Sequence, residues 1–184
     1  FESVKPYPSL ALGAFEVSPW QVATAFTVFA NGGVKTELRT VKKVAGADGK
    51  TLERSQIEVE RVLHPQTAYI LTDMMETVIS SGTGPPVRRW GFTRPAAGKT
   101  GTTDEYRDAW FVGYTPNLLC VVWTGYDDNT PIKMTGAQAA LPIWVQFMKK
   151  ATQNLPTEDF ASPQGVVVAM IDPETGQLAT EDCP

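Results

Sequence analysis

The chain has 184 residues, of which 42% are hydrophobic and 20% are charged, and its formal net charge at pH 7 is −4. These values are typical of a soluble globular domain with a substantial core, and the lack of a long basic run gives no support to a nucleic-acid-binding surface. The longest strongly apolar run, residues 118–123, is far too short to span a bilayer, and no signal peptide begins at Phe1. Because the chain starts abruptly and without Met, we expect it to be a fragment.

The first predicted helix begins after Ser18. Ser18 can cap the helix, Pro19 suits its first position, and Gln21 can close a capping box. Apolar residues then recur at helical spacing until an Asn-Gly-Gly stop at residues 31–33. Residues 1–17 are expected to be an extended or looped entry to this helix.

The next segment, residues 34–62, alternates loosely around a Gly-Ala-Asp-Gly sequence at residues 46–49, which predicts a β-hairpin or a pair of short strands. A second helix is expected to begin at Pro65 and to end at the Gly- and Pro-rich residues 82–86. The apolar face of this second helix should contain Ala68, Leu71, Met75 and Val78, widened by Ile70, Met74 and Ile79.

Three strands are predicted in succession, over residues 96–103, 107–115 and 118–126. Residues 115–117, Thr-Pro-Asn, should join the last two strands as a tight hairpin. The high apolar density of these two strands indicates a sheet that is covered on both faces.

A helix over residues 137–152 should pack on this sheet, with Pro142 at its first turn or at a kink. After residue 156 the composition loosens, and residues 165–176 predict a strand and then a turn outside the main body. The expected apolar stripe of the helix is Ala140, Trp144, Phe147 and Met148.

Residues 99–103, Lys-Thr-Gly-Thr-Thr, are the most informative feature of the chain. On a strand edge, this run places a fixed cation, a hydroxyl and a bare stretch of backbone side by side. Active-site serine enzymes that bind D-alanyl peptides or β-lactams use that set as one of three motifs. The other two are missing, because no serine is followed three residues later by Lys or two residues later by Asn. We therefore expect part of an active site, with the nucleophile in a segment outside this chain.

Six segments of the sequence together carry a family resemblance. They are PSLALG (8–13), FANGG (29–33), GTG (82–84), AGKTGTT (97–103), RDAWFVGY (107–114) and WTGYDD (123–128). With these segments the chain resembles the C-terminal half of the transpeptidase domain of a class A penicillin-binding protein, and the last three favour class A over class B proteins or β-lactamases. The resemblance implies an α/β (α+β) fold of the serine β-lactamase/D,D-transpeptidase type, with an antiparallel sheet flanked by helices on both faces, here as an incomplete domain.

The resemblance also implies roles for the Lys-Thr-Gly strand. Lys99 would supply a positive field beside the proton relay of the missing Ser-x-Asn serine. The hydroxyls of Thr100 and Thr102 can bind the substrate's terminal carboxylate, and the Thr102 N–H can be one oxyanion donor. Gly101 has no side chain, so a peptide can lie against this edge as an added strand. Thr103 is also assigned to substrate binding, although an ordinary strand position suits it equally.

Several other polar residues have plainer interpretations. Residues 104–107 are expected to form a solvated turn beside the cleft, and Asp108 is expected to form a structural pair with Arg107. His64, the only histidine, is expected at a helix start, so no Ser-His-Asp triad is available. Cys120 is expected to be a buried thiol. Cys183, at the extreme end, is free to pair with a residue beyond it, and neither cysteine has metal-ligand spacing.

The function implied by the resemblance is serine D,D-transpeptidation, which cross-links peptidoglycan stem peptides ending in D-Ala-D-Ala through an acyl-serine intermediate and which β-lactams inhibit. One alternative is a D,D-carboxypeptidase or β-lactamase of the same superfamily, and another is a non-catalytic penicillin-recognising sensor or scaffold. The sequence upstream of Phe1 should discriminate between them, because a catalytic protein needs Ser-x-x-Lys and Ser-x-Asn there.

Further expectations concern the surroundings of the chain. The upstream half of the same domain should be its structural partner, no nucleic acid is expected, and no metal or organic cofactor is implied. The protein would face the periplasm or the cell exterior, anchored at the membrane by an N-terminal segment. Residues 1–156 are expected to be the C-terminal part of the transpeptidase domain, and residues 157–184 a C-terminal extension.

Overall fold

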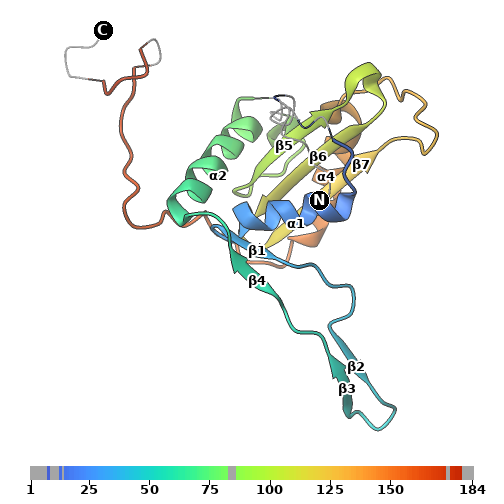
Figure 1. Ribbon diagram of the computed structural model, residues 1–184. Helices are drawn as coiled ribbons and strands as arrows, with labels where there is room; N and C mark the ends of the chain where they lie inside the picture. The colour runs from blue at the N-terminus through green and yellow to red at the C-terminus, as the bar shows by residue number, and fades with distance from the viewer. Residues whose placement is uncertain (1–7, 9–12, 14, 83–85, 173–174, 180–184) are drawn as a thin grey trace.

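The computed structural model describes residues 8, 13, 15–82, 86–172 and 175–179 (Figure 1). Most of residues 1–17, the GTG segment beyond Gly82, and Cys183 lie outside the described residues. In chain order the elements are α1 (Pro19–Ala30), β1 (Val34–Thr36), β2 (Lys43–Ala45), β3 (Thr51–Arg54), β4 (Val59–Arg61), α2 (Pro65–Ser80), α3 (Pro86–Arg89), β5 (Ala97–Thr102), the 3₁₀ turn η2 (Asp104–Tyr106), β6 (Ala109–Thr115), β7 (Leu118–Thr124) and α4 (Gly136–Ala151).

The centre of the molecule is an antiparallel meander of β5, β6 and β7. Helices α1 and α2 pack against one face of this sheet and α4 packs against the other (Figure 1). The three predicted strands, the tight turn after Thr115 and the covering of both faces are therefore confirmed. The expected architecture of an antiparallel sheet flanked by helices on both faces is also confirmed.

The two faces of β6 make different contacts, because successive strand residues point to opposite sides. On the α4 side, Trp144 packs edge-on against Phe111 and donates from its indole nitrogen to the Gly113 carbonyl at 3.1 Å. Gly113 must be small, because a Cβ there would lie 2.7 Å from the Trp144 ring. On the α2 side, the Tyr114 hydroxyl is 2.8 Å from that of Thr72, and burial raises the pKa of Tyr114 to about 12.

Local signals at the helix ends are confirmed where the sequence is explicit. Ser18 and Gln21 form the predicted capping box at α1, and helix α2 begins at Pro65. Thr135 and Gln138 form a second capping box at α4, which the sequence analysis did not identify. Pro142 was expected either in the first turn of α4 or at a kink. It lies inside α4, past the first turn, so only the kink remains as an expectation.

Three apolar residues that were expected in helix faces packed on the core are exposed. Ile70 and Met74 in α2 have exposed fractions of 52% and 59%, and Phe147 in α4 has 50%. Instead, α2 buries the polar Thr72. A pattern of apolar residues cannot identify this position, because Thr72 is buried through the hydrogen bond between its hydroxyl and that of Tyr114. The core does include Ile79, Ala140, Trp144 and Met148 as expected.

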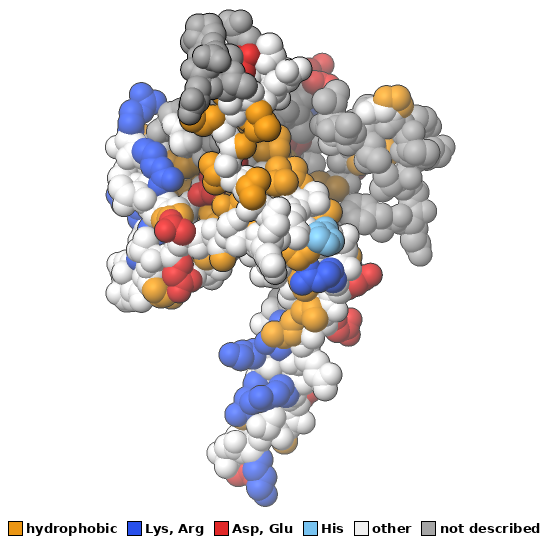
Figure 2. All heavy atoms as spheres, turned by 90° about the vertical axis from the view of Figure 1, so that its left-hand side faces the viewer, with side chains coloured by type: hydrophobic (Ala, Val, Ile, Leu, Met, Phe, Trp, Pro, Cys, Tyr) orange, Lys and Arg blue, Asp and Glu red, His pale blue; other side chains and the backbone are white. Residues whose placement is uncertain are grey.

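Residues 34–61 form an arm that projects from the body (Figure 1). Strands β1 and β4 pair at its base, and β2 and β3 pair near its tip, so the expected hairpin consists of two short ladders. The Gly46 N–H donates to the Lys50 carbonyl at 2.9 Å and closes the tip at the predicted position. Figure 2 shows Lys and Arg side chains along this arm.

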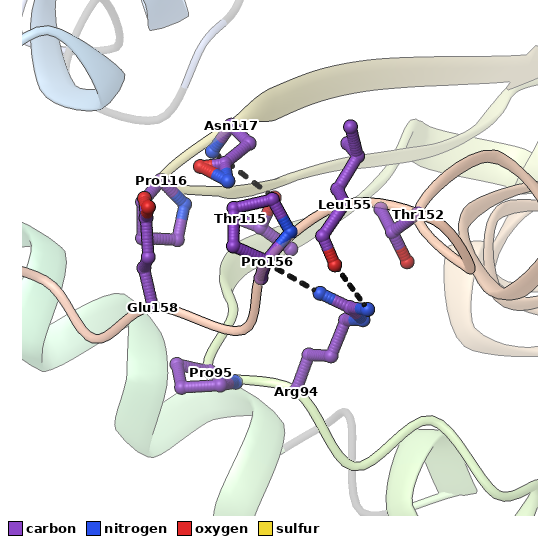
Figure 3. A pocket seen from close by; sticks show the side chains of 9 residues that line it. All are labelled: Arg94, Pro95, Thr115, Pro116, Asn117, Thr152, Leu155, Pro156 and Glu158. Carbon is purple, nitrogen blue, oxygen red and sulfur yellow. Dashed lines mark hydrogen bonds between the residues drawn. The ribbon is translucent and has the colours of Figure 1, made fainter.

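The segment after α4 passes beside Arg94 and the hairpin between β6 and β7, where Leu155, Pro156 and Glu158 line a small pocket (Figure 3). The Arg94 guanidinium donates to the carbonyls of Leu155 and Pro156, both at 2.8 Å, and the Phe160 ring packs edge-on against Tyr114. These contacts tie the chain to the sheet beyond the end of the last helix.

The strand that was expected over residues 165–171 is not formed, which corrects that expectation. Val167 and Val168 are 83% and 103% exposed, and only an isolated bridge joins Ile171 to Leu178 in the described part of this segment. The apolar, β-branched composition favours a strand, but a strand also needs a neighbour to accept its backbone hydrogen bonds.

Candidate active site

The candidate site is the carboxyl-terminal half of β5, which lies at the edge of the sheet. The Thr103 N–H donates to the Asp108 carbonyl at 3.1 Å, so this position is a hydrogen-bonded pair with β6. Antiparallel pairs alternate, and the N–H and C=O groups of Thr102 and Thr100 therefore point away from β6. No strand among the described residues pairs with that outer edge.

Burial changes sharply along β5. Ala97 is fully buried and Gly98 is also buried, whereas Lys99 and Thr102 are exposed and Thr100 is half-buried. The half of the strand that carries the Lys-Thr-Gly-Thr sequence is thus the half that a ligand can reach. Its outward backbone groups are positioned to pair with an added strand.

The side chains of this strand alternate between two faces of the sheet. Lys99 and Gly101 lie on the face that carries Trp110 and Trp123, and the Lys99 ammonium donates to the Thr100 carbonyl at 2.8 Å. Thr102 lies on the opposite face, where its hydroxyl accepts from the Gly136 N–H at 3.1 Å. The cation and the outward backbone donors therefore meet at one strand end, while the Thr102 hydroxyl also holds the start of α4.

Gly136 is a site-supporting residue that sequence reasoning missed. It is buried at the first position of α4, directly over the β5–β6 ladder. A Cβ at Gly136 would lie 2.3 Å from the Trp110 carbonyl oxygen and 2.6 Å from that of Gly101. The only signal for Gly136 in the sequence is that it follows the capping Thr135. That signal does not reveal its contact with Thr102, which is 34 residues away in the chain.

Residues 104–107, in the turn between β5 and β6, are all exposed, as expected for a solvated turn. Glu105 and Tyr106 adopt left-handed backbone conformations, with φ of 59° and 55°. The Tyr106 carbonyl accepts from the backbone N–H groups of Ile132 and Lys133 at 2.9 and 3.2 Å, which joins this turn to the loop before α4.

The expected pairing of Asp108 with Arg107 is wrong. Arg107 instead forms an ion pair with Glu105 at 2.5 Å, because the left-handed turn brings these two side chains together. Asp108 is half-buried and accepts from the Trp123 indole N–H at 2.8 Å. It also contacts Thr103, whose hydroxyl accepts from the Asp108 N–H at 2.8 Å.

The free thiol and the possible metal ligands of the described residues add no further chemistry to this site. Cys120 is half-buried, and burial raises the pKa of its thiol to about 11, so the thiol is protonated at neutral pH. Within residues 8, 13, 15–82, 86–172 and 175–179, no cluster of three His, Cys, Asp or Glu side chains could hold a metal ion. The same part of the chain contains no helix that is long and apolar enough to cross a bilayer.

The small pocket in Figure 3 is not part of this site. Its lining includes Thr115, Pro116 and Asn117, at the hairpin between β6 and β7. In the sheet register Lys99 lies opposite Val112, so the hairpin is at the other end of β6 from the open half of β5.

The fold and the site define a class of protein. A meander with helices on both faces, whose edge strand carries Lys-Thr-Gly-Thr at its open end, is the arrangement expected of penicillin-recognising serine acyltransferase domains. The family model for the penicillin-binding protein transpeptidase domain matches residues 3–149. The chain belongs to this family.

Curated relatives with similar sequences are class A penicillin-binding proteins. Penicillin-binding protein 1A of Aquifex aeolicus is 41% identical over 184 residues, which cover 99% of this chain and 25% of that protein. Penicillin-binding protein 1B of Escherichia coli is 35% identical over 87% of this chain and 19% of its own length. The chain therefore spans about a quarter or less of these relatives.

Solved structures agree in fold. The crystal structure of penicillin-binding protein 1A from Haemophilus influenzae matches with a TM-score of 0.88 and 26% identity, covering 96% of this chain and 32% of that one. PonA1 from Mycobacterium tuberculosis, also a penicillin-binding protein, matches with a TM-score of 0.76 and 26% identity, covering 88% of this chain and 45% of that one.

Proposed function

We propose that this chain is the C-terminal part of the transpeptidase domain of a class A penicillin-binding protein, and that the full-length protein cross-links peptidoglycan. The observation that carries the proposal is the open, carboxyl-terminal half of β5, where Lys99 and the outward N–H of Thr102 lie together. An upstream segment would supply the Ser-x-x-Lys nucleophile and the Ser-x-Asn relay. Residues 1–156 belong to the domain in this proposal, and residues 157–184 form an extension.

The reaction is acyl transfer between two stem peptides. The serine oxygen attacks the carbonyl carbon between the two D-Ala residues, and the serine proton passes through the relay to the leaving nitrogen. The C–N bond breaks, the terminal D-Ala departs as the free amine, and an acyl-serine remains. The amine of a second stem peptide then attacks this ester, forms the cross-link and returns a proton to the serine.

Each residue of the open strand has a distinct part in this reaction. The Thr102 N–H binds the oxyanion as its negative charge develops, where a preorganised donor contributes most. Gly101 lets the peptide backbone approach the edge. Lys99 supplies a positive field beside the serine relay, and the Thr100 and Thr102 hydroxyls bind the terminal carboxylate. Thr103, exposed at the end of the strand, is also assigned to substrate binding, although its N–H and its hydroxyl are both bonded to Asp108.

An uncovered apolar surface supports the docking of the upstream half of the domain. Ile70 and Met74 are more than half exposed on α2, and Figure 2 shows hydrophobic side chains gathered above the arm on the side where α2 lies. Patches of this kind mark protein interfaces. The full-length protein would work outside the cytoplasm, at the periplasmic or exterior face of the membrane, held by an N-terminal anchor.

The proposal is tested by labelling with a fluorescent penicillin. We expect a covalent label on the full-length protein, at a serine upstream of Phe1, and no label on this chain alone. A label on a serine within residues 1–184 would contradict the proposed location of the nucleophile. A full-length protein that takes no label would instead fit the non-catalytic sensor, and rapid loss of the label by hydrolysis would fit a β-lactamase.

The role of Thr100 gives a separate prediction. Thr100→Val in the full-length protein should slow acylation by carboxylate-bearing β-lactams by about 10- to 100-fold, because a hydrogen bond to a charged group contributes about 1.5–3 kcal/mol. Acylation by β-lactam esters should change far less. Thr102→Ser is the matched control, since it keeps the hydroxyl that accepts from the Gly136 N–H. Equal losses for acids and esters would exclude carboxylate binding by Thr100.

A further inference from the structure

Asp108 connects the end of the candidate catalytic strand to the far strand of the sheet. Its Oδ1 accepts from the Trp123 indole N–H in β7 at 2.8 Å. Its Oδ2 accepts from the Thr103 hydroxyl at 3.4 Å, and its backbone N–H donates to that hydroxyl at 2.8 Å. The Thr103 N–H donates in turn to the Asp108 carbonyl at 3.1 Å. A single half-buried residue thus links the ends of β5, β6 and β7.

The carboxylate occupies a site that the surrounding residues leave open for it. Gly125 lies beside it, and a Cβ on Gly125 would be 2.7 Å from the Asp108 Oδ1 and 2.6 Å from the Trp123 ring. Trp123 packs against Trp110 with ring centroids 6.2 Å apart, and Trp110 lies opposite Gly101 in the sheet. The Asp108–Trp123 bond therefore also fixes the aromatic layer behind Gly101.

The position of this linkage matters because Thr103 directly follows Thr102. The Thr102 N–H points out from the open edge, where no second strand among the described residues fixes its direction. Apart from the bond of the Thr102 hydroxyl to the Gly136 N–H, its alignment depends on the two residues that flank it, Gly101 and Thr103, and both rest on groups tied through Trp123. An oxyanion donor must be aligned before reaction, and a misplacement of about 1 Å in an active site can cost about 100-fold in rate.

We propose that Asp108 is a positioning residue for transpeptidation, which holds the Thr102 N–H in line for the oxyanion by bonding Thr103 to Trp123. This inference rests on the proposed function. Asp108 does not touch the reacting atoms itself. This role differs from general support of the fold, because the hydrogen bonds of Asp108 end on Thr103, next to the Thr102 donor, and on Trp123, which packs against Trp110 behind Gly101.

The test measures acylation of the full-length protein by penicillin, with the acylation rate constant separated from the dissociation constant of the initial complex. Asp108→Ala should lower the rate constant by about 10- to 100-fold and leave the dissociation constant nearly unchanged. Affinity for a boronic acid, whose tetrahedral adduct with the serine carries the oxyanion, should fall by a similar factor. A merely structural loss would reduce the amount of active protein without changing either constant.

Three further variants complete the design. Asp108→Asn keeps an oxygen for the Trp123 N–H and should restore most of the rate. Trp123→Phe removes the indole donor and should reproduce the loss, and combining it with Asp108→Ala should add little. Asp128→Ala is the matched control, because this exposed carboxylate accepts from the Thr130 N–H in the loop after β7 and should not affect the rate.

The outcomes separate the inference from the proposed function. A wild-type protein that is not acylated refutes the proposed function and the inference with it. If the wild type is acylated but folded Asp108→Ala reacts within about twofold of it, only the inference is overturned. The inference is equally overturned if Asp108→Asn is as slow as Asp108→Ala. Should Asp108→Ala not fold, Trp123→Phe decides, and a wild-type acylation rate in that variant would refute the linkage.

Discussion

Gly101→Val is expected to give a folded full-length protein whose acylation rate falls by about 10²–10³-fold, the typical loss when one oxyanion donor is removed. Gly101 lies outside the left-handed backbone region, so valine meets no backbone strain there. Its Cβ would lie 3.2 Å from the Trp110 Cβ, a tight contact that a small shift can relieve. The branched side chain would instead crowd the ligand strand, about 4.8 Å away, and turn the ligand carbonyl from the Thr102 N–H.

The measurement pairs a penicillin acylation rate with thermal unfolding. The melting temperature of the transpeptidase domain should fall by no more than a few degrees, because about 1 kcal/mol shifts a domain of roughly 150–250 residues by about that much. Gly101→Ala is the graded control and should lose less activity than the valine variant. A folded Gly101→Val protein that is acylated at the wild-type rate would show that substrate does not lie along β5.

Lys99→Ala is expected to slow acylation of the full-length protein by about 10- to 100-fold without unfolding it. The lysine is exposed and its ammonium donates to the neighbouring Thr100 carbonyl, so its removal takes little from the core. The expected loss follows from a charge-assisted interaction of about 1.5–3 kcal/mol in a desolvated site.

Lys43→Ala provides the comparison for this variant. Lys43 is also an exposed strand lysine, but it lies in the arm, in β2. Both variants should keep the wild-type melting temperature, and only Lys99→Ala should lose acylation rate. If acylation by Lys99→Ala stays within about twofold of wild type, Lys99 is an ordinary surface residue and the assignment of the site fails.

The candidate strand could be found from the sequence because its residues are contiguous. The Lys-Thr-Gly-Thr run needs no long-range information to be recognised, and the turn after Thr115 sets the meander that presents it. The helix starts at Ser18 and Pro65 were equally local signals, since capping depends on residues within one turn. These features account for most of the architecture around the site.

The features that could not be predicted depend on contacts between distant residues. Asp108 and Trp123 are 15 positions apart and meet only because β6 and β7 pair. The pairing of Arg107 with Glu105 depends on a left-handed turn at Glu105 and Tyr106. The sequence does not indicate this turn, because it has no glycine at either position. Ile70 and Met74 look like core residues in a helical pattern, yet no described residue buries them. The position of the proposed nucleophile could not be predicted either, because no serine of this chain stands in a Ser-x-x-Lys motif.

The outer edge of β5 also has a consequence for solubility. A sheet edge with outward N–H and C=O groups can pair with the edge of another molecule, and natural proteins oppose such self-association by placing a lysine on the strand. In β5 that residue is Lys99, the same side chain that we assign to catalysis. The positive charge of Lys99 would therefore serve both catalysis and protection against edge-to-edge association. In the isolated chain its loss should increase concentration-dependent aggregation, even though no acyl transfer can take place there.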